Sequence, residues 1–217
     1  MTREVVVASP ETSLADALAL LQERRIRHLP VVEGGALVGL VSDRDLRSEV
    51  PAPGVIAEAE RQALLREKRV GAVMGRDMVV VDPDTPVEEA ARLMAHHRIG
   101  CLPVVVGAEV VGILTASDLV RAFVELFGVN KPSSRLEVRM PNRPGELARV
   151  VRLIGVEERV NITGLVMPPA STTEVMAVIR VQTVDPRRII EGLRRLGYEV
   201  GWPALDLPPE PPRAPAS

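Results

Sequence analysis

The stretch Leu29-Pro30-Val31-Val32 recurs 73 residues later as Leu102-Pro103-Val104-Val105. Outward from these two stretches, residues 1–46 align without a gap on residues 74–119, with 19 identical residues among the 46 pairs. Two copies of one supersecondary unit usually pack on each other, because each leaves an apolar face that the other can cover. The sequence therefore predicts two copies of one small α/β domain that pack together.

Each repeat has the hydrophobic pattern of a β-α-β-β-α unit. An amphipathic helix is expected to open at Ser13, and the turn Glu33-Gly34-Gly35 predicts a hairpin in the first repeat. The other expected elements are strands at residues 5–7, 29–32, 37–41, 78–81, 102–106 and 110–114, with a helix at 87–97.

The rest of the chain has a different pattern. A strand at 136–140, a turn at 141–145, a helix through Leu147 to Ile154, two more strands, a helix from Asp185 and a last strand from Tyr198 give β-α-β-β-α-β, a ferredoxin-like unit. The predicted domains are repeat 1 (1–50), a helical insert (51–73), repeat 2 (74–125), a linker (126–134), a ferredoxin-like domain (135–205) and a proline-rich tail (206–217).

Composition excludes several classes of protein. The net charge of −2 lacks the basic excess of a nucleic acid binder, and no apolar run approaches the roughly 18 residues of a membrane span. The repeat begins at Met1, which leaves no room for a signal peptide, so we expect a cytoplasmic protein. The single cysteine, Cys101, has no partner at metal-ligand spacing, and we expect no metal site.

One polar pattern occurs in both repeats, between a strand and a helix. A hydroxyl precedes a carboxylate by three positions at Ser42 and Asp45, and again at Thr115 and Asp118. This is the pattern of a helix capping box. The capping box alone does not explain the glycine three residues before each hydroxyl, where a missing side chain lets another group approach the backbone. A ribose on the carboxylate and a phosphate at the helix start would fit such a place. The two glycines are Gly39 and Gly112.

Both repeats resemble CBS domains, which are named after cystathionine β-synthase. The resemblance lies in Ile26-x-x-Leu29-Pro30-Val31 followed by Gly39-x-x-Ser42-x-x-Asp45, and in the same pattern from Ile99 to Asp118. It implies a tandem pair that binds adenosine nucleotides in two clefts. The aspartates would hold ribose hydroxyls, the hydroxyls would approach phosphate, and the Leu-Pro-Val strands would lie beside adenine. The residues implied are Leu29, Pro30, Val31, Gly39, Ser42, Arg44, Asp45, Leu102, Pro103, Val104, Gly112, Thr115 and Asp118. His28, just before the first of these strands, could touch a phosphate, but its counterpart in the second repeat is Cys101, which favours solvent exposure or capping as its role.

The third domain resembles an ACT domain, a small regulatory unit that often binds amino acids and usually pairs side by side. The resemblance rests on Arg143-Pro144-Gly145-Glu146-Leu147 at the first strand-to-helix turn and on Asn161-Ile162 at the start of the second strand. It implies a candidate ligand turn formed by Asn142, Arg143, Pro144, Gly145 and Asn161. Asn142 stands where an acid is common, and Pro144 with Gly145 could simply make the turn. The order CBS-CBS-ACT resembles the acetoin-utilisation AcuB-type proteins.

The leading hypothesis is a regulatory protein without catalytic activity, a homodimer that binds an adenine nucleotide and relays its presence to the ACT domain and to a regulated enzyme that the sequence does not identify. AMP is the first candidate, before ADP, ATP and S-adenosylmethionine. The alternative is a structural adaptor with vestigial ligand sites. An enzyme of acetoin or acetyl-CoA metabolism is the third hypothesis, and no nucleophile-base pair in the sequence supports it.

Overall fold

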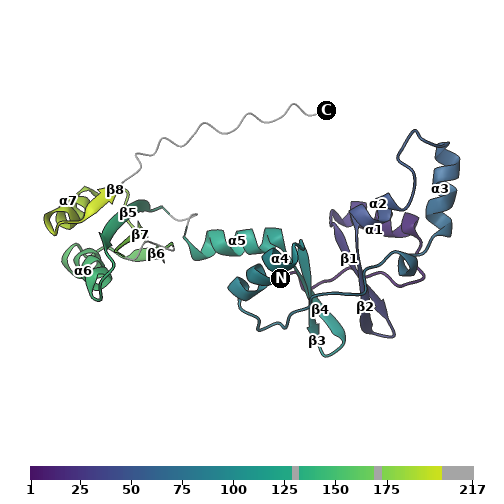
Figure 1. The fold of residues 1–217 in the computed structure, drawn as a ribbon, viewed down its shortest axis with the longest axis horizontal. Coiled ribbons are helices and arrows are strands. Elements are labelled where there is room, and N and C mark those ends of the chain that lie inside the picture. Colours follow the sequence, from purple (N-terminus) through teal and green to yellow (C-terminus); the bar gives the residue numbers. More distant parts are fainter. Residues whose placement is uncertain (129–131, 169–172, 202–217) are drawn as a thin grey trace. The chain divides into compact units, whose positions relative to one another are not determined.

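The computed structural model describes residues 1–128, 132–168 and 173–201, which fall into two compact units (Figure 1). Unit 1 is residues 1–120 and holds both repeats, and unit 2 begins at Arg121. The proline-rich tail predicted at 206–217 lies outside the described residues.

The first repeat is a helix, a hairpin and a short helix. Ser13 caps the first helix, since its hydroxyl accepts a hydrogen bond from the Asp16 amide at 3.1 Å. The hairpin turns at Gly34 and Gly35, whose φ angles of 60° and 87° suit glycine, as the turn prediction required. The elements are α1 (Leu14–Arg24), β1 (His28–Glu33), β2 (Ala36–Ser42) and α2 (Asp43–Ser48).

The second repeat has the same order, and its hairpin carries the same irregularity. The antiparallel register shifts between Val31 and Val32 in the first hairpin and between Val104 and Val105 in the second, which are equivalent positions of the repeat. The two hairpins therefore share a β-bulge as well as a sequence pattern. The elements are α4 (Val87–His97), β3 (Cys101–Val106), β4 (Glu109–Thr115) and α5 (Ala116–Leu126).

The first strand predicted in each repeat, at residues 5–7 and 78–81, does not form a continuous ladder. Only isolated bridges join these segments to their own hairpins, from Ala8 to Val31 and from Val81 to Val104. Each repeat is thus an α-β-β-α unit with an extended leading segment, rather than the predicted β-α-β-β-α unit.

The leading segments make backbone hydrogen bonds to both repeats. Ala8 and Val81, at their ends, bond to their own hairpins, and residues near their starts bond to the other repeat. Thr2 exchanges hydrogen bonds of 3.0 and 3.1 Å with Ile113 of the second repeat. Gly75, which leads the second repeat, exchanges bonds of 2.9 and 3.0 Å with Leu40 of the first. The repeats are therefore tied together by reciprocal exchange of their leading segments.

The insert between the repeats covers the first repeat. It contains α3 (Glu58–Glu67) and a 3₁₀ turn, η1 (Val70–Ala72). Leu65 and Val70 are buried in the same core as α1, and the Leu14 amide donates to the Lys68 carbonyl at 3.1 Å. The insert is thus part of the packed structure of repeat 1.

Unit 2 contains a four-stranded antiparallel sheet in the order β6-β7-β5-β8. Alternate residues of β5 and β7 are buried against Val150 of α6 and Leu193 of α7, so both helices pack on one face of the sheet. The elements are β5 (Ser134–Pro141), α6 (Glu146–Arg152), a π-helical turn η2 (Leu153–Glu157), β6 (Ile162–Val166), β7 (Glu174–Val181), α7 (Arg187–Arg195) and β8 (Glu199–Gly201).

Candidate ligand site

Both predicted capping boxes are present, with nearly identical geometry. Asp45 Oδ2 accepts hydrogen bonds from the Ser42 amide at 2.9 Å and from the Ser42 hydroxyl at 2.6 Å. In the second repeat Asp118 Oδ2 accepts the equivalent bonds from Thr115 at 2.9 and 2.8 Å. Each hydroxyl also accepts a bond from the amide of its aspartate, at 3.2 Å in both repeats. Each hydroxyl proton is committed to a carboxylate, so neither hydroxyl is placed to donate to a phosphate.

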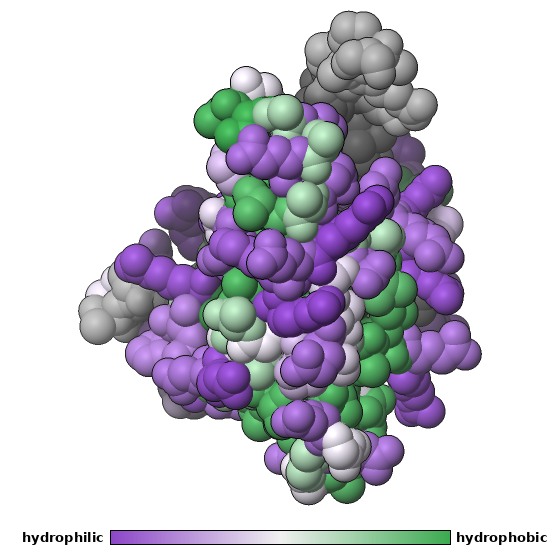
Figure 2. All heavy atoms as spheres, turned by 90° about the vertical axis from the view of Figure 1, so that its right-hand side faces the viewer, coloured by the Kyte–Doolittle hydropathy of each residue, from purple (hydrophilic) through white to green (hydrophobic). Residues whose placement is uncertain are grey.

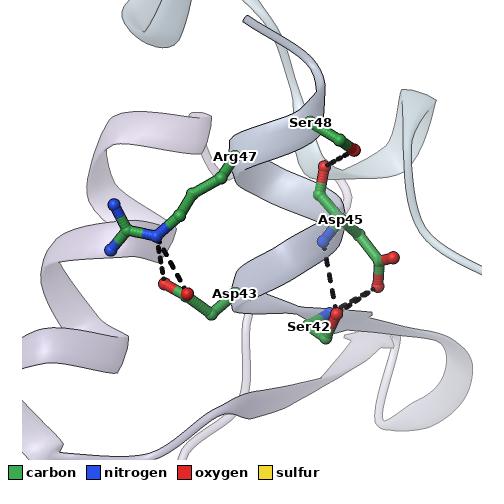
Figure 3. Close-up of polar contacts among 5 residues, drawn as sticks. All are labelled: Ser42, Asp43, Asp45, Arg47 and Ser48. Atoms are coloured by element: carbon green, nitrogen blue, oxygen red, sulfur yellow. Dashed lines mark hydrogen bonds and ion pairs between the residues drawn. The ribbon is translucent and has the colours of Figure 1, made fainter. Parts of the chain in front are cut away.

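The capping box holds one oxygen of Asp45 and leaves the other outside it. Figure 3 shows Oδ2 directed at Ser42 while the second carboxylate oxygen points away from the box. Within the described part of the chain, that second oxygen, Oδ1, takes part in no hydrogen bond. A carboxylate fixed through one oxygen presents the other as an acceptor in a defined place.

A cavity of about 1030 Å³ lies beside this carboxylate, within unit 1. Roughly 300–1,000 Å³ is usual for sites that enclose small molecules. Both repeats line it: Arg27, His28, Leu40, Ser42, Asp43, Arg44 and Asp45 come from the first, Val73 precedes the second, and Gly75, Asp77, Met78, Val79, His97, Arg98, Ile99, Gly100 and Cys101 come from the second. The cavity therefore depends on the packing of the repeats on each other.

Charge in this cavity is mixed, and one acidic group is already neutralised. Asp43 accepts hydrogen bonds from Nε of Arg47 at 2.8 and 2.9 Å, on the opposite side of α2 from Asp45 (Figure 3). The same contact raises the pKa of the Arg47 guanidinium. The counterion of Asp43 is thus Arg47. Arg44 stays in the cavity lining, together with Arg27 and Arg98.

Equivalent positions of the two repeats carry different ionisable groups at this cavity. His28 opens β1 and Cys101 opens β3. Burial lowers the pKa of His28, and the Arg27 guanidinium lowers it further, while the Asp45 carboxylate acts in the opposite direction. Burial raises the pKa of the Cys101 thiol to about 11, so this thiol is neutral at physiological pH.

The two glycines are explained by the exchange of leading segments. A Cβ added at Gly39 would lie 2.4 Å from Sδ of Met74, and one added at Gly112 would lie 2.8 Å from Sδ of Met1. Met1 and Met74 are themselves equivalent residues of the repeat. In each repeat, a methionine of a leading segment thus occupies the space beside the glycine, where a ligand group was expected.

The Leu-Pro-Val strands belong to the core. Leu29 and Val31 are fully buried, and Leu29 packs with Leu14 of α1 and Leu46 of α2. Leu102 is fully buried as well. None of Leu29, Pro30, Val31, Gly39, Leu102, Pro103, Val104, Gly112, Thr115 and Asp118 lines the cavity, whereas His28, Ser42, Arg44 and Asp45 do.

Sequence reasoning missed the aliphatic lining of the cavity. Leu40, Val73, Met78, Val79 and Ile99 supply it. The exchange of hydrogen bonds between Leu40 and Gly75 brings several of these residues together. The repeat alignment placed Met78 in a strand of its own repeat. Hydrophobic periodicity carries no information about hydrogen bonds between one repeat and the leading segment of the other.

In unit 2 the predicted ligand turn and Asn161 lie apart. The turn at Asn142 follows the end of β5 that pairs with Glu174, whereas Asn161 lies beside Gln182, at the opposite end of β7. Seven residues of β5 separate these ends, about 23 Å at the usual rise of a strand. Within one chain the turn, with Arg143, Pro144 and Gly145, therefore makes no joint site with Asn161.

One buried polar contact closes the start of α6. The Tyr198 hydroxyl donates to Oε2 of Glu146 at 2.5 Å, and the Arg149 guanidinium lies 5.9 Å from the centre of the Tyr198 ring. Burial raises the pKa of Tyr198, and the bond to Glu146 adds to the effect. This contact ties the turn before α6 to β8.

The described residues form neither a cluster of metal ligands nor a helix that could span a membrane. There, no group of three or more His, Cys, Asp and Glu side chains could hold a metal ion. None of the helices in the described ranges is long and apolar enough to cross a bilayer. The face drawn in Figure 2 is largely hydrophilic, with hydrophobic residues in smaller groups between the polar ones.

Comparison with known proteins gives consistent results for the two repeats. The CBS domain profile matches residues 1–52 and 70–125. The chain is 33% identical over 119 residues to the CBS domain-containing protein YhcV of Bacillus subtilis, which covers 55% of this chain and 79% of YhcV. It is 33% identical over 152 residues to an inosine-5'-monophosphate dehydrogenase of Korarchaeum cryptofilum, but this match covers 70% of this chain and only 29% of the enzyme.

A solved structure shares the fold of this region. The crystal structure of a candidate acetoin utilization protein (AcuB) from Vibrio cholerae is 35% identical, covers 60% of this chain and 90% of its own, and superposes with a TM-score of 0.50. The two profile matches, the relation to YhcV and the paired hairpins agree with one another. This chain belongs to the family of CBS domain proteins and carries a tandem CBS pair.

Proposed function

We propose that this protein is a regulatory sensor without catalytic activity, which binds an adenine nucleotide in the cavity beside Asp45. AMP is the first candidate, followed by ADP, ATP and S-adenosylmethionine. The observation that carries the proposal is the fixed carboxylate of Asp45, whose Oδ2 is held by Ser42 and whose Oδ1 is free of hydrogen bonds within the described residues. Such an oxygen can accept bonds from the hydroxyls of a ribose, as an acid does in dinucleotide folds.

The rest of the cavity lining supports a nucleotide. Apart from one tyrosine, one tryptophan and two phenylalanines, all beyond residue 122, the chain has no aromatic side chain, so aliphatic groups would have to enclose adenine. Leu40, Met78 and Ile99 line the cavity and are of that kind. Arg27, Arg44 and Arg98 line it as well, and arginine suits phosphate oxygens.

A second site in the other repeat is part of the proposal. Asp118 forms the same kind of capping box as Asp45, and each repeat exchanges backbone hydrogen bonds with the leading segment of the other. By repeat equivalence, Arg25 would stand where Arg98 stands in the Asp45 cavity. Residues Arg27, His28, Gly100 and Cys101 would lie between the two sites, because they are one another's repeat equivalents.

Unit 2 is proposed to act as an ACT domain that passes on the nucleotide signal. Its β-α-β-β-α-β order and its sheet order support this proposal. We also propose a cytoplasmic homodimer, in line with exposed apolar side chains such as Val55 and Val106, which are 69% and 58% exposed. The likeness to the AcuB structure supports a role in acetoin metabolism, and the regulated enzyme is a proposed partner.

Titration calorimetry of the nucleotide-free protein tests the proposal. AMP is expected to bind with micromolar affinity, and Asp45→Asn should weaken binding. The second candidate function is an adaptor protein whose capping boxes only stabilise the fold. The Ser42 hydroxyl, which donates to the Asp45 carboxylate and accepts from the Asp45 amide, is consistent with this role as well. If the folded protein binds none of AMP, ADP, ATP and S-adenosylmethionine, the adaptor function is favoured instead.

A further inference from the structure

His28 lies next to the capping box of the first repeat. In the β1–β2 pair, His28 is directly opposite Ser42, and directly opposed residues have Cβ atoms about 4.5–5.5 Å apart on one face of the pair. The Asp43 amide donates to the Arg27 carbonyl at 3.0 Å, which fixes the start of β1 against the start of α2. The imidazole therefore stands beside the carboxylate proposed to hold the ribose.

The second repeat closes the other side of the imidazole. A Cβ at Gly100 would lie 3.7 Å from Cε1 of His28, so the ring packs against the backbone that leads into β3. His28 is half-buried and lines the cavity.

Charged groups of both signs face His28 from the elements around it. Asp43, Arg44 and Asp45 come from α2, Arg27 precedes β1, Asp77 lies in the leading segment of repeat 2, and His97 and Arg98 end α4. Asp43 is paired with Arg47. Three arginines then face two unpaired carboxylates, Asp45 and Asp77, so the cavity favours an anionic ligand even while the imidazole is neutral.

Burial favours the uncharged form of the imidazole in the free protein. Desolvation is the largest cause of the lowered pKa of His28, and Arg27 acts in the same direction. A phosphate dianion in the cavity would bring negative charge close to the ring and raise its pKa again. The direction of the change follows from the sign of the ligand charge alone.

We propose that a phosphate-bearing ligand entering the cavity beside Asp45 drives protonation of His28, so that this site separates a phosphorylated nucleoside from an uncharged one, and does so more strongly as the pH falls. This inference rests on the proposed function, because it assumes a nucleotide in the cavity. The inference adds a form of regulation to the site, because occupancy by the ligand would depend on pH as well as on the ligand concentration.

The second repeat lacks this property. Cys101 occupies the equivalent place, opposite Thr115 in the β3–β4 pair. Its thiol is neutral throughout the physiological range and cannot take up a further proton there. Of these two equivalent residues, only His28 can therefore couple ligand binding to pH.

Titration calorimetry with AMP and with adenosine between about pH 6.5 and pH 8 tests the inference, since histidine titrates in this range. The lower limit stays above the second phosphate pKa of about 6. AMP affinity should rise about fivefold from pH 8 to pH 6.5, within the tenfold limit per pH unit of a single proton, and adenosine affinity should not change. Repeating the titration in buffers of different ionisation enthalpy should show net proton uptake with AMP.

His28→Gln should abolish the pH dependence of AMP binding, and His97→Gln should retain it. His97 is the matched control because it also lines the cavity and ends α4 on the exposed side. AMP binding that is pH-independent in the native protein would overturn the inference and leave the proposed function intact. A pH dependence lost in His97→Gln but kept in His28→Gln would also overturn it, and absence of AMP binding at every pH would overturn both.

Discussion

The two repeats have one scaffold and different chemistry at equivalent positions. Both hairpins shift register at the same place, and both capping boxes have the same bonds within 0.2 Å. At the cavity, however, His28 corresponds to Cys101, and Asp43 corresponds to Ala116. Shared residues thus maintain the fold and the fixed carboxylate, while unshared residues differ in charge.

The largest expected effect is on stability, and it tests whether the Leu-Pro-Val strands belong to the hydrophobic core or to the ligand site. Leu29→Ala and Leu102→Ala should each lower the free energy of unfolding by about 2–5 kcal/mol, because both side chains are fully buried. Urea unfolding measures this, and the two variants should behave alike. Unchanged stability with weakened AMP binding would place the Leu-Pro-Val strands beside the base after all.

The glycines should reveal a difference between the repeats. Gly39→Ala should cost about 2 kcal/mol, since Met74 is only 8% exposed and cannot move away. Gly112→Ala should cost less, because the opposing Met1 is 45% exposed and can turn outward. Urea unfolding of both variants checks the order.

Met74→Ala added to Gly39→Ala should recover part of the loss, because it removes the clash. Equal losses at the two glycines, with no recovery, would mean that the exchange of leading segments is not what requires them.

The capping-box aspartates should affect nucleotide affinity. Asp45→Asn and Asp118→Asn should each weaken their own site about tenfold, corresponding to about 1.5 kcal/mol for a hydrogen bond to a charged group. Calorimetric titration with AMP measures the loss. If each single variant left binding unchanged, the carboxylates would be structural only.

The chain offers a matched control for lost capping. Asp16 forms two of the same three contacts with Ser13: its Oδ2 accepts from the Ser13 hydroxyl at 2.7 Å, and its amide donates to that hydroxyl at 3.1 Å. Asp16 does not line the cavity. Asp16→Asn should reduce stability by about 1 kcal/mol, as loss of a cap does, without changing AMP affinity. A parallel loss of affinity in this variant would show that capping, not ribose contact, explains the result.

The smallest effect concerns a charge present in one repeat only. Arg47→Ala should weaken AMP binding at the first site about twofold at low salt, since it leaves the Asp43 charge unpaired in the cavity. The effect should fade as salt is raised. In the variant Asp43→Ala, which resembles the second repeat, Arg47→Ala should have no effect on binding. Tighter binding after Arg47→Ala would contradict the charge assignment.

Local features were predictable from the sequence, and contacts between repeats were not. The Gly34-Gly35 turn and the Ser42 and Asp45 box are set by neighbours within three residues, so their patterns are visible in the chain itself. Hydrophobic runs at 5–7 and 78–81 predicted strands, but only isolated bridges at Ala8 and Val81 join these segments to their own hairpins. The bonds to the other repeat come from Thr2 and Gly75, outside the hydrophobic runs.

Part of the candidate site was predictable for the same reason. Asp45, Ser42 and His28 were identified because they belong to the repeated motif or adjoin it. Val79 and Ile99 were missed because they reach the cavity only through the exchange between repeats. The packing of Met74 on Gly39 was not predicted, because these two residues are 35 positions apart in the sequence.

The central claim is that the cavity beside Asp45 binds an adenine nucleotide, and calorimetric titration of nucleotide-free protein with AMP tests it most directly. The account predicts micromolar binding that Asp45→Asn weakens about tenfold. Folded protein that shows no heat of binding with AMP, ADP, ATP or S-adenosylmethionine would contradict it.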